Sequence, residues 1–381
     1  MLNSNNKVKQ TIISCIILIS FSLLKTETYA QNTFQKAIGT PNQDELGISL
    51  IKLTENRLLH LIQIAENDEV NHNFGLLITD LNGHIIQKTE YELEGNQWPT
   101  ELLQSSDGGF LLGGRTRYNN KQTGELLKVR QDLTLDWSIT LQPGPTMIFS
   151  FINEDEQGNI YVGGDFEMNL RDFLLIKLDK DGEELWSRSW GQQDNDHIYD
   201  LQILDNGDLL LLCNTWMGFS QDLVIINVSP DGEVLSQKSI FQGMQYYGQS
   251  ILDLQDNTFL LLGKLYSGET FLVRLNSSLE TIWAKKVGAN GGDLWLKNGY
   301  CHNNKIYLSG NFSRNNGDIA VLALDYLGNI DWLMTYGGYE LDGIRHLSES
   351  NIVVAENNLY INGFTESFQN NSSDIYLLNL I

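Results

Sequence analysis

Several aromatic residues and carboxylates stand in turns, outside any regular pattern of the chain. An aromatic ring offers a flat apolar face and a carboxylate offers hydrogen-bond acceptors, so together they suit a carbohydrate, a peptide or a protein surface. We therefore predict a ligand site among them, with local packing as the alternative role of each ring. The candidate ligand-binding residues are Trp98, Asp194, Asp196, Trp216, Tyr246, Tyr247, Trp295, Tyr339 and Asp342.

Carboxylates in the expected loops could also do chemistry, because glycoside hydrolysis needs two carboxyl groups about 5–10 Å apart. Acidic side chains in turns commonly bind backbone N–H groups instead. No residues converge as a catalytic group by spacing, so we predict none and favour a noncatalytic binding or interaction protein. The alternative is a glycan-acting hydrolase or lyase that uses the loop carboxylates Asp44, Glu45, Asp194, Asp196, Asp293, Glu340 and Asp342.

Metal and cofactor motifs are missing from the sequence. The six histidines lack metal-ligand spacing, and the adjacent Cys301 and His302 cannot complete a zinc site. Residues 153–158 mimic the start of a calcium loop, but Gly164 stands where the twelfth-position Glu is required. Neither a nucleophile elbow nor a phosphate-binding loop is present. We therefore predict no metal site and no cofactor.

An internal repeat defines the elements that must position these residues. Residues 172–186 and 318–332 share an apolar run, an Asp that ends it, a Gly three positions later and a Trp. The residue that ends the run recurs about every 50 residues, a period typical of propeller blades. Its successive positions are Asp80, Arg130, Asp179, Ser229, Asn276, Asp325 and Ile381.

The repeat predicts an all-β fold, a seven-bladed β-propeller with four antiparallel strands in each blade. Short strands such as residues 159–164 and 305–310 precede each repeated run, and Asp-Gly pairs supply the positive φ of tight hairpins. Residues 31–381 then form a single propeller domain. Its blades are placed at about residues 44–93, 94–143, 144–191, 192–243, 244–288, 289–338, and 339–381 together with 32–39.

The two ends of the sequence are predicted to complete one blade together. The last repeat stops at Ile381 without an outer strand, whereas residues 34–39 match the outer strand of residues 186–191. Phe34 takes the Trp position and Gly39 takes the Gly position of that strand. We expect the N-terminal strand to pair with the last strand, because an unpaired edge would expose its backbone groups.

Other positions recur once per repeat and predict structural roles. Trp137, Trp186, Trp283 and Trp332 share one position and should cover the contacts between neighbouring blades. A mostly acidic or amide position before the third strand should tie its turn to backbone N–H groups. It is occupied by Asn73, Thr123, Asp172, Asp222, Glu269, Asp318 and Asp374.

The cysteines are predicted to remain unpaired thiols. After the N-terminal segment only Cys213 and Cys301 remain, and they fall in the fourth and sixth predicted blades. These blades are not neighbours, whereas a disulfide requires Cα atoms within about 7 Å of each other.

The first thirty residues match a secretory signal. Lys7 and Lys9 precede an apolar run over residues 11–24, and Thr28-Tyr29-Ala30 places small residues before a cleavage site. We expect cleavage after Ala30 and an exported protein, periplasmic or secreted. An uncleaved anchor and a lipoprotein cut before Cys15 are alternatives, but each apolar run is short for its purpose. No later run is long enough to insert the mature chain in a membrane.

The charge balance excludes several partners. The chain has 25 basic and 48 acidic residues and a formal net charge of −23. Nucleic-acid binding requires a basic face, so we predict no nucleic-acid partner. Anionic lipid surfaces are disfavoured for the same reason. The expected partner is a glycan, a peptide or a protein of unknown identity, and the sequence does not predict an oligomeric state.

The pattern apolar-Asp-x-x-Gly-x-x-x-Trp, as in Leu178 to Trp186, resembles the bacterial β-propeller repeats known as SBBP repeats. The resemblance covers nearly all of residues 32–381 and implies a propeller in an exported bacterial protein of undefined role. The pattern is also similar to quinoprotein-type propellers. Those usually have eight blades and an adjacent cysteine pair, which this chain lacks. Residues 110–114 and 160–164, each followed by a downstream Trp, resemble kelch repeats, which are the second choice because later repeats lack the double glycine.

Overall fold

All regular secondary structure in the described part of the computed structural model is β-strand. The described residues are 32–40, 43–53, 56–66, 72–141, 146–167, 171–191, 196–217, 220–242, 246–289, 291–313, 317–344, 351–367 and 373–380. Within them the chain forms 29 strands and no helix, so the all-β prediction is confirmed.

Most strands belong to antiparallel sheets of four strands that follow one another along the sequence. The first is β2 (Gln43–Lys52), β3 (Arg57–Glu66), β4 (His72–Asp80) and β5 (Ile85–Tyr91). Another is β14 (His197–Ile203), β15 (Leu209–Met217), β16 (Ser220–Val228) and β17 (Val234–Phe241). It is followed by β18 (Tyr246–Asp253), β19 (Thr258–Leu265), β20 (Thr270–Asn276) and β21 (Thr281–Val287). Next come β22 (Leu294–His302), β23 (Lys305–Phe312), β24 (Asp318–Asp325) and β25 (Ile330–Tyr336).

The other two sheets depart from this simple pattern. An eight-stranded sheet holds β6 (Asn96–Gln104), β7 (Phe110–Tyr118), β8 (Lys121–Val129), β9 (Leu135–Leu141), β10 (Thr146–Glu154), β11 (Ile160–Glu167), β12 (Arg171–Leu178) and β13 (Glu184–Trp190). The terminal sheet holds β1 (Asn32–Ile38), β26 (Asp342–Gly343), β27 (Ile352–Ala355), β28 (Asn358–Thr365) and β29 (Asp374–Leu380).

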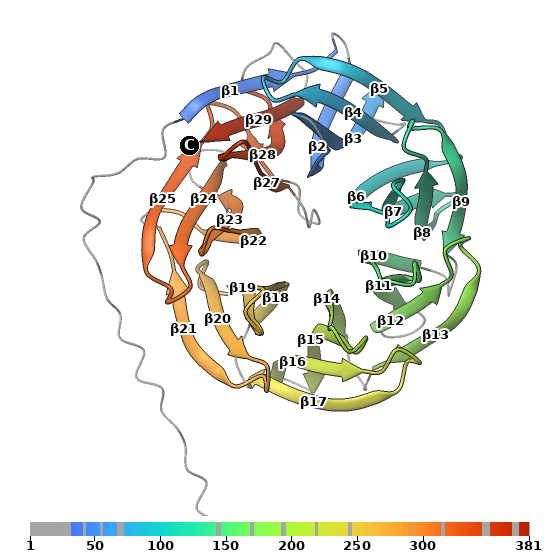
Figure 1. Cartoon of the computed structure of the whole chain (residues 1–381), viewed down its shortest axis with the longest axis vertical. Coiled ribbons are helices and arrows are strands. Elements are labelled where there is room, and N and C mark those ends of the chain that lie inside the picture. Colours follow the sequence, from blue (N-terminus) through green and yellow to red (C-terminus); the bar gives the residue numbers. More distant parts are fainter. Residues whose placement is uncertain are drawn as a thin grey trace, which may run out of the picture.

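The sheets stand side by side around a central axis (Figure 1). In each group of four strands the first strand is innermost and the last is outermost, and β2 returns to contact β28 of the terminal sheet. As predicted, the N-terminal strand pairs with the last strand: β1 runs antiparallel to β29, with Phe34 opposite Asn379 and Ile38 opposite Ile375. The two ends of the chain therefore share one sheet.

The repeated Asp and Gly residues build the outer hairpins. Asp179 Oδ1 accepts the N–H groups of Asp181 and Glu183, and Gly182 has a φ of +86°. Asp80 and Asn276 bind the N–H groups of their own turns in the same way. A carboxylate or amide oxygen that satisfies two turn N–H groups, followed by a residue free to adopt positive φ, explains the repeat signature.

Apolar residues fill the contact between each pair of neighbouring sheets, here called a seam. The seam between β2–β5 and β6–β9 includes the buried Ile48, Phe74, Leu112 and Leu127. The recurring Trp residues close such seams at the outer edge, as the sequence predicts. Trp186 Nε1 donates to Pro230 O of the next sheet at 3.2 Å, and Trp283 Nε1 donates to Tyr326 O at 3.0 Å.

The acidic position before the third strand has a role that the sequence did not reveal. A Cβ on Gly39, Gly191 or Gly337 would overlap the carboxylate of Asp374, Asp172 or Asp318, respectively. The recurring glycine of the outer strand thus makes room for this side chain. Burial raises the pKa of Asp374 to about 6, with the negative charges of Glu45 and Asp44 acting in the same direction.

Three further predictions concern the cysteines, the signal and membrane insertion. Cys213 and Cys301 are free thiols, as expected. The predicted signal, residues 1–30, lies outside the described residues. In the part of the chain that is described, no helix has the length and apolar character needed to cross a membrane.

Candidate functional site

Most of the predicted ligand-binding residues lie where the innermost strands begin. Trp98 is in β6, Tyr246 and Tyr247 begin β18, Trp295 is in β22, and Asp342 begins β26. The first and second strands of a sheet are antiparallel neighbours, so the first strand begins on the side of the sheet where the second strand finishes. We call this end of the ring the entry face.

The remaining predicted residues are placed less completely. Asp196 lies directly before β14 and is fully buried, and Tyr339 lies between β25 and β26 with 94% of its surface exposed. Trp216 is in β15, but its side chain lies outside the described part of the structure. Asp194 also lies outside the described residues.

Two of the predicted residues have structural surroundings. The Tyr246 ring is buried and stacks on Phe241, with the ring centroids 4.2 Å apart, and it also meets the edge of Phe271. Asp342 is 2% exposed and accepts hydrogen bonds from Ser367 Oγ and from the N–H of Gly338. Little of either side chain is left for a ligand.

A polar residue near the end of the second strand holds neighbouring sheets together on the entry face in at least two places. Asn311 binds both the N–H and the C=O of Ile344 in the terminal sheet. Asn214 binds Gly248 N and Tyr246 O of β18 in the same way. The side chain at this position therefore ties its sheet to the innermost strand of the next sheet.

Arg115 and Lys264 occupy the same position but do something else. The Arg115 guanidinium lies over the ring of Trp98, 5.2 Å from its centroid. Lys264 Nζ lies 5.1 Å from the centroid of Trp295. Both distances fall within the range of a cation–π interaction. Each cation is thus placed beside a predicted ligand-binding Trp on the entry face.

The Trp98 group combines three side chains from two sheets. The ring of His72, at the start of β4, meets Trp98 edge to face at 5.6 Å between centroids. Arg115 is half-buried, and burial lowers the pKa of its guanidinium, which nevertheless keeps its charge at any physiological pH. Arg115 Nε is enclosed and has no hydrogen-bond partner among the described residues. A buried N–H donor of this kind is costly unless something accepts from it.

In the Trp295 group the two cations are already engaged. Lys264 Nζ forms an ion pair with Asp293 at 3.2 Å. Lys297 is fully buried, donates to Ile344 O at 2.9 Å, and lies 4.8 Å from the Trp295 centroid. This group is therefore better explained by packing between β22 and the terminal sheet than by a ligand.

A histidine–carboxylate pair on the entry face was missed in the sequence. His197 Nδ1 lies 2.6 Å from Asp165 Oδ2, and Asp165 Oδ1 accepts the N–H of Ile198 at 3.0 Å. Asp165 is 4% exposed, and the ring of Tyr199 lies 6.2 Å from that of His197. A buried carboxylate that is hydrogen-bonded to an imidazole holds the ring in a fixed orientation, which is the arrangement of a general base. The only sequence signal was the polar position that Asp165 shares with Asn214 and Asn311.

Two of the loop carboxylates proposed for catalysis, Glu45 and Asp44, bind groups of the protein itself. Glu45 accepts the N–H of Thr40 at 2.7 Å and pairs with Lys88. Asp44 accepts the N–H of Ser373 at 2.8 Å. Among the described residues no cluster of three or more His, Cys, Asp or Glu side chains could hold a metal ion.

Comparison with known proteins gives the fold a context. No protein-family model matches the sequence, and no curated protein matches it. An ulvan lyase of a polysaccharide lyase family, solved with bound GlcA(1-4)Rha3S, aligns with a TM-score of 0.58 and 10% identity, covering 90% of this chain and 96% of the lyase. The polysaccharide lyase Uly1 aligns with a TM-score of 0.53 and 10% identity over 93% and 94% of the two chains.

A third similar structure is the β-propeller domain of the Trilobed protease from Pyrococcus furiosus. It aligns with a TM-score of 0.51 and 12% identity over 87% of this chain and 93% of the domain. That domain is described as having an open velcro topology, whereas in this chain β1 and β29 are hydrogen-bonded neighbours. The likenesses establish a propeller-type fold and leave the chemistry of the entry face to be argued from its own residues.

Proposed function

We propose that this chain is an exported, seven-bladed β-propeller of the SBBP-repeat type that binds an acidic glycan on its entry face without turning it over. Export is inferred from the signal pattern of residues 1–30. The blade count is inferred from the sheets. The eight-stranded sheet separates into β6–β9 and β10–β13, which share a single parallel residue pair, Gln122 with Thr146. With these groups counted separately, the sheets match the seven sequence repeats.

The observation that carries the binding proposal is the half-buried Arg115 guanidinium that lies over the ring of Trp98 on the entry face. A guanidinium binds carboxylates and sulfates with paired N–H donors. An adjacent indole offers a flat face to the apolar side of a sugar ring. A uronic acid or a sulfated sugar satisfies both features at once. The net negative charge of the whole chain repels an anionic glycan, so the local cation must provide the attraction.

Replacing Arg115 tests this proposal directly. Arg115→Gln is expected to weaken binding of polygalacturonate at least tenfold, because one charge-assisted contact contributes about 1.5–3 kcal/mol. Isothermal titration calorimetry would measure this, with neutral dextran as the comparison glycan. Arg117→Gln is the matched control, since Arg117 lies two positions along the same strand and is exposed. Unchanged affinity in Arg115→Gln, or equal binding of dextran, would contradict the proposal.

A polysaccharide lyase is the second candidate function, and the Asp165–His197 pair favours it. A lyase removes the proton beside a uronate carboxylate and breaks the adjacent C–O bond, so that a conjugated double bond forms and the leaving oxygen takes up a proton. An imidazole supported by a buried carboxylate suits the proton-removal step. The two lyases of similar fold are compatible with this function, but at 10% identity they indicate only the fold.

Turnover assays separate the two candidates. On the binding proposal, polygalacturonate and ulvan are bound, and neither the near-ultraviolet absorbance of an unsaturated uronate nor the number of reducing ends increases. On the lyase alternative, both signals rise, and His197→Gln reduces the rate at least a hundredfold, the usual contribution of a general base. His84→Gln is the control, because His84 is exposed and contacts only Asp80 of its own turn.

A further inference from the structure

The outer edges of the seams show a regular contact between a Trp and the next sheet. The indole of Trp137 lies against Gly182, that of Trp186 against Gly232, and that of Trp283 against Gly328. Each glycine belongs to the tight turn between the third and fourth strands of the following sheet. Two of these Trp residues also donate their Nε1–H to a carbonyl of that turn. The turn is thus the usual occupant of the space above each Trp.

Lysine side chains reinforce the same contact. Lys177 Nζ donates to Pro230 O at 3.3 Å, beside the Trp186 bond to the same oxygen. Lys285 Nζ donates to Gly328 O in the seam that Trp283 covers. An indole N–H and an ammonium group together therefore bind the exposed carbonyls of a tight turn.

Among the described residues, no such turn lies above the Trp of the seam after β22–β25. Its Trp is Trp332, and the following sheet is the terminal sheet, whose third and fourth strands are β29 and β1. These strands pair at Leu380 and Asn32 but lie at opposite ends of the sequence, so no hairpin turn joins them. Trp332 Nε1 has no hydrogen-bond partner among the described residues, in contrast to Trp186 and Trp283.

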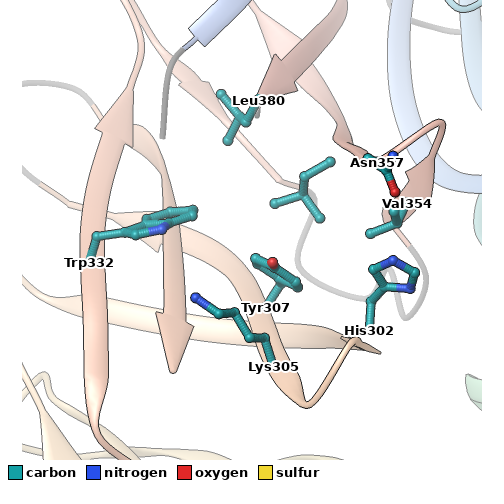
Figure 2. Close-up of a pocket in the computed structure, with 8 residues that line it drawn as sticks. His302, Lys305, Tyr307, Trp332, Val354, Asn357 and Leu380 are labelled. Carbon is teal, nitrogen blue, oxygen red and sulfur yellow. The ribbon is translucent and has the colours of Figure 1, made fainter. Parts of the chain in front are cut away.

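A pocket of about 240 Å³ is present at this place (Figure 2). Its aromatic side is formed by Trp332 and Tyr307, whose ring centroids are 6.4 Å apart. Its apolar floor includes Leu359 and Leu380, which are 5% and 0% exposed.

The polar rim of this pocket repeats the chemistry of the filled seams. Lys305 contributes an ammonium group that is held by Asp331 at 2.7 Å, and the rim also includes His302 and Asn357. An indole and an ammonium group thus both line this pocket, as both contribute to the seams where turns are bound. A volume of 240 Å³ is smaller than that of most drug-sized ligand sites, and it suits the tip of a turn.

We propose that this pocket binds a tight turn of a partner protein with glycine at its fourth position, like the turns of residues 179–182, 229–232 and 325–328 that occupy the equivalent seams of this chain. Trp332 packs on the turn glycine and donates to a turn carbonyl. Lys305 donates to a second turn carbonyl, as Lys285 does in its own seam. The site lies at the opposite end of β22 from Trp295, because β22 runs from Leu294 to His302. A partner bound here would leave the entry face open for a glycan.

A cyclic peptide containing Asp-Lys-Asp-Gly, the sequence of residues 179–182, is the probe, and the full-length mature protein labelled with ¹⁵N-tryptophan is the target. The indole resonance of Trp332, assigned with Trp332→Phe, is expected to shift saturably on titration. The resonances of Trp186 and Trp283 should not move, since their N–H groups are already bonded. Trp332→Phe should weaken binding at least tenfold, whereas Trp283→Phe should bind the peptide normally even if its unfolding temperature falls.

Several outcomes would overturn the proposal. One is the absence of a shift at millimolar peptide, and another is an equal shift with a linear peptide of scrambled sequence. Slow hydrogen exchange of the Trp332 indole in the free protein would mean that a segment of this chain, or a second copy, already fills the pocket. A shift produced equally by glucose would assign the pocket to a sugar.

Discussion

A chain that lacks residues 32–40 is expected to lose the cooperative unfolding transition of the full chain, or to unfold at a much lower temperature. These residues form β1, which pairs with β29 from Ile38 opposite Ile375 to Asn32 opposite Leu380. Ile38 is 4% exposed and Leu377 of β29 is fully buried. Removing β1 exposes this apolar surface and leaves one edge of β29 unpaired, at a cost on the order of 5–10 kcal/mol. Domains commonly have only 5–15 kcal/mol of stability in total.

The matched control is a chain that begins at Gln31, which retains all of β1 and should unfold like the unprocessed protein. Differential scanning calorimetry would compare the two truncations. A synthetic peptide of residues 31–40, added in trans, is expected to restore part of the transition, because β1 joins β29 by strand pairing and no turn connects the two strands directly. An unchanged melting temperature without residues 32–40 would mean that β1 does not hold the terminal sheet together.

The pairing of β1 with β29 was predictable because its signal is a local pattern. Phe34 and Gly39 repeat the spacing of Trp186 and Gly191, and β1 indeed lies beside β29. The turns were predictable for the same reason. Where an Asp ends the apolar run, as Asp80 and Asp179 do, it binds N–H groups two and four residues away, so its contacts are contained in the repeat itself.

The entry face was less predictable, because its contacts depend on irregular strands. The pairing register of β6 with β7 shifts between Pro99 and Glu101, and β22 shifts with β23 between Leu296 and Asn298. A bulge turns the following side chains to the other face of a strand. Lys297, inside one such bulge, is fully buried. The regular in-and-out alternation of side chains along a strand does not predict the burial of Lys297.

The role of Arg115 could not be assigned from its position alone. Equivalent positions hold Asp165, Asn214 and Asn311, which bind the backbone of the next sheet. Arg115 differs because it is a cation and its guanidinium lies over the ring of Trp98, its pairing partner across β6 and β7. The contact of Arg115 with Trp98 therefore depends on the pairing register of β6 with β7. The repeat pattern does not predict where the bulge shifts that register.

Buried ionisable groups predict an unusual dependence of stability on pH. Burial raises the pKa of Glu125 to about 7 and that of Asp200 to about 6. Asp374 is likewise raised to about 6. The folded state then binds these protons more readily than the unfolded state, so stability rises as pH falls through 7 and 6. His60 acts in the opposite sense: burial lowers its pKa from 6.5 to about 4, so its contribution declines below pH 6.5.

Between pH 8 and pH 5 the three carboxyl groups outweigh the histidine, and the free energy of unfolding is expected to increase by about 3 kcal/mol. Urea titrations at several pH values would measure this.

Glu125→Gln should remove most of the increase, because Glu125 has the highest pKa of the three carboxyl groups and takes up its proton over most of this pH range. His60→Gln should enlarge the increase, because it removes the opposing group. Glu184→Gln, on an exposed site of an outer strand, should leave the profile unchanged. The opposite signs of the first two variants make the assignment specific, since a general loss of stability would shift both profiles without changing their slopes. A flat profile in the unmodified protein would mean that these carboxyl groups reach solvent in the folded state.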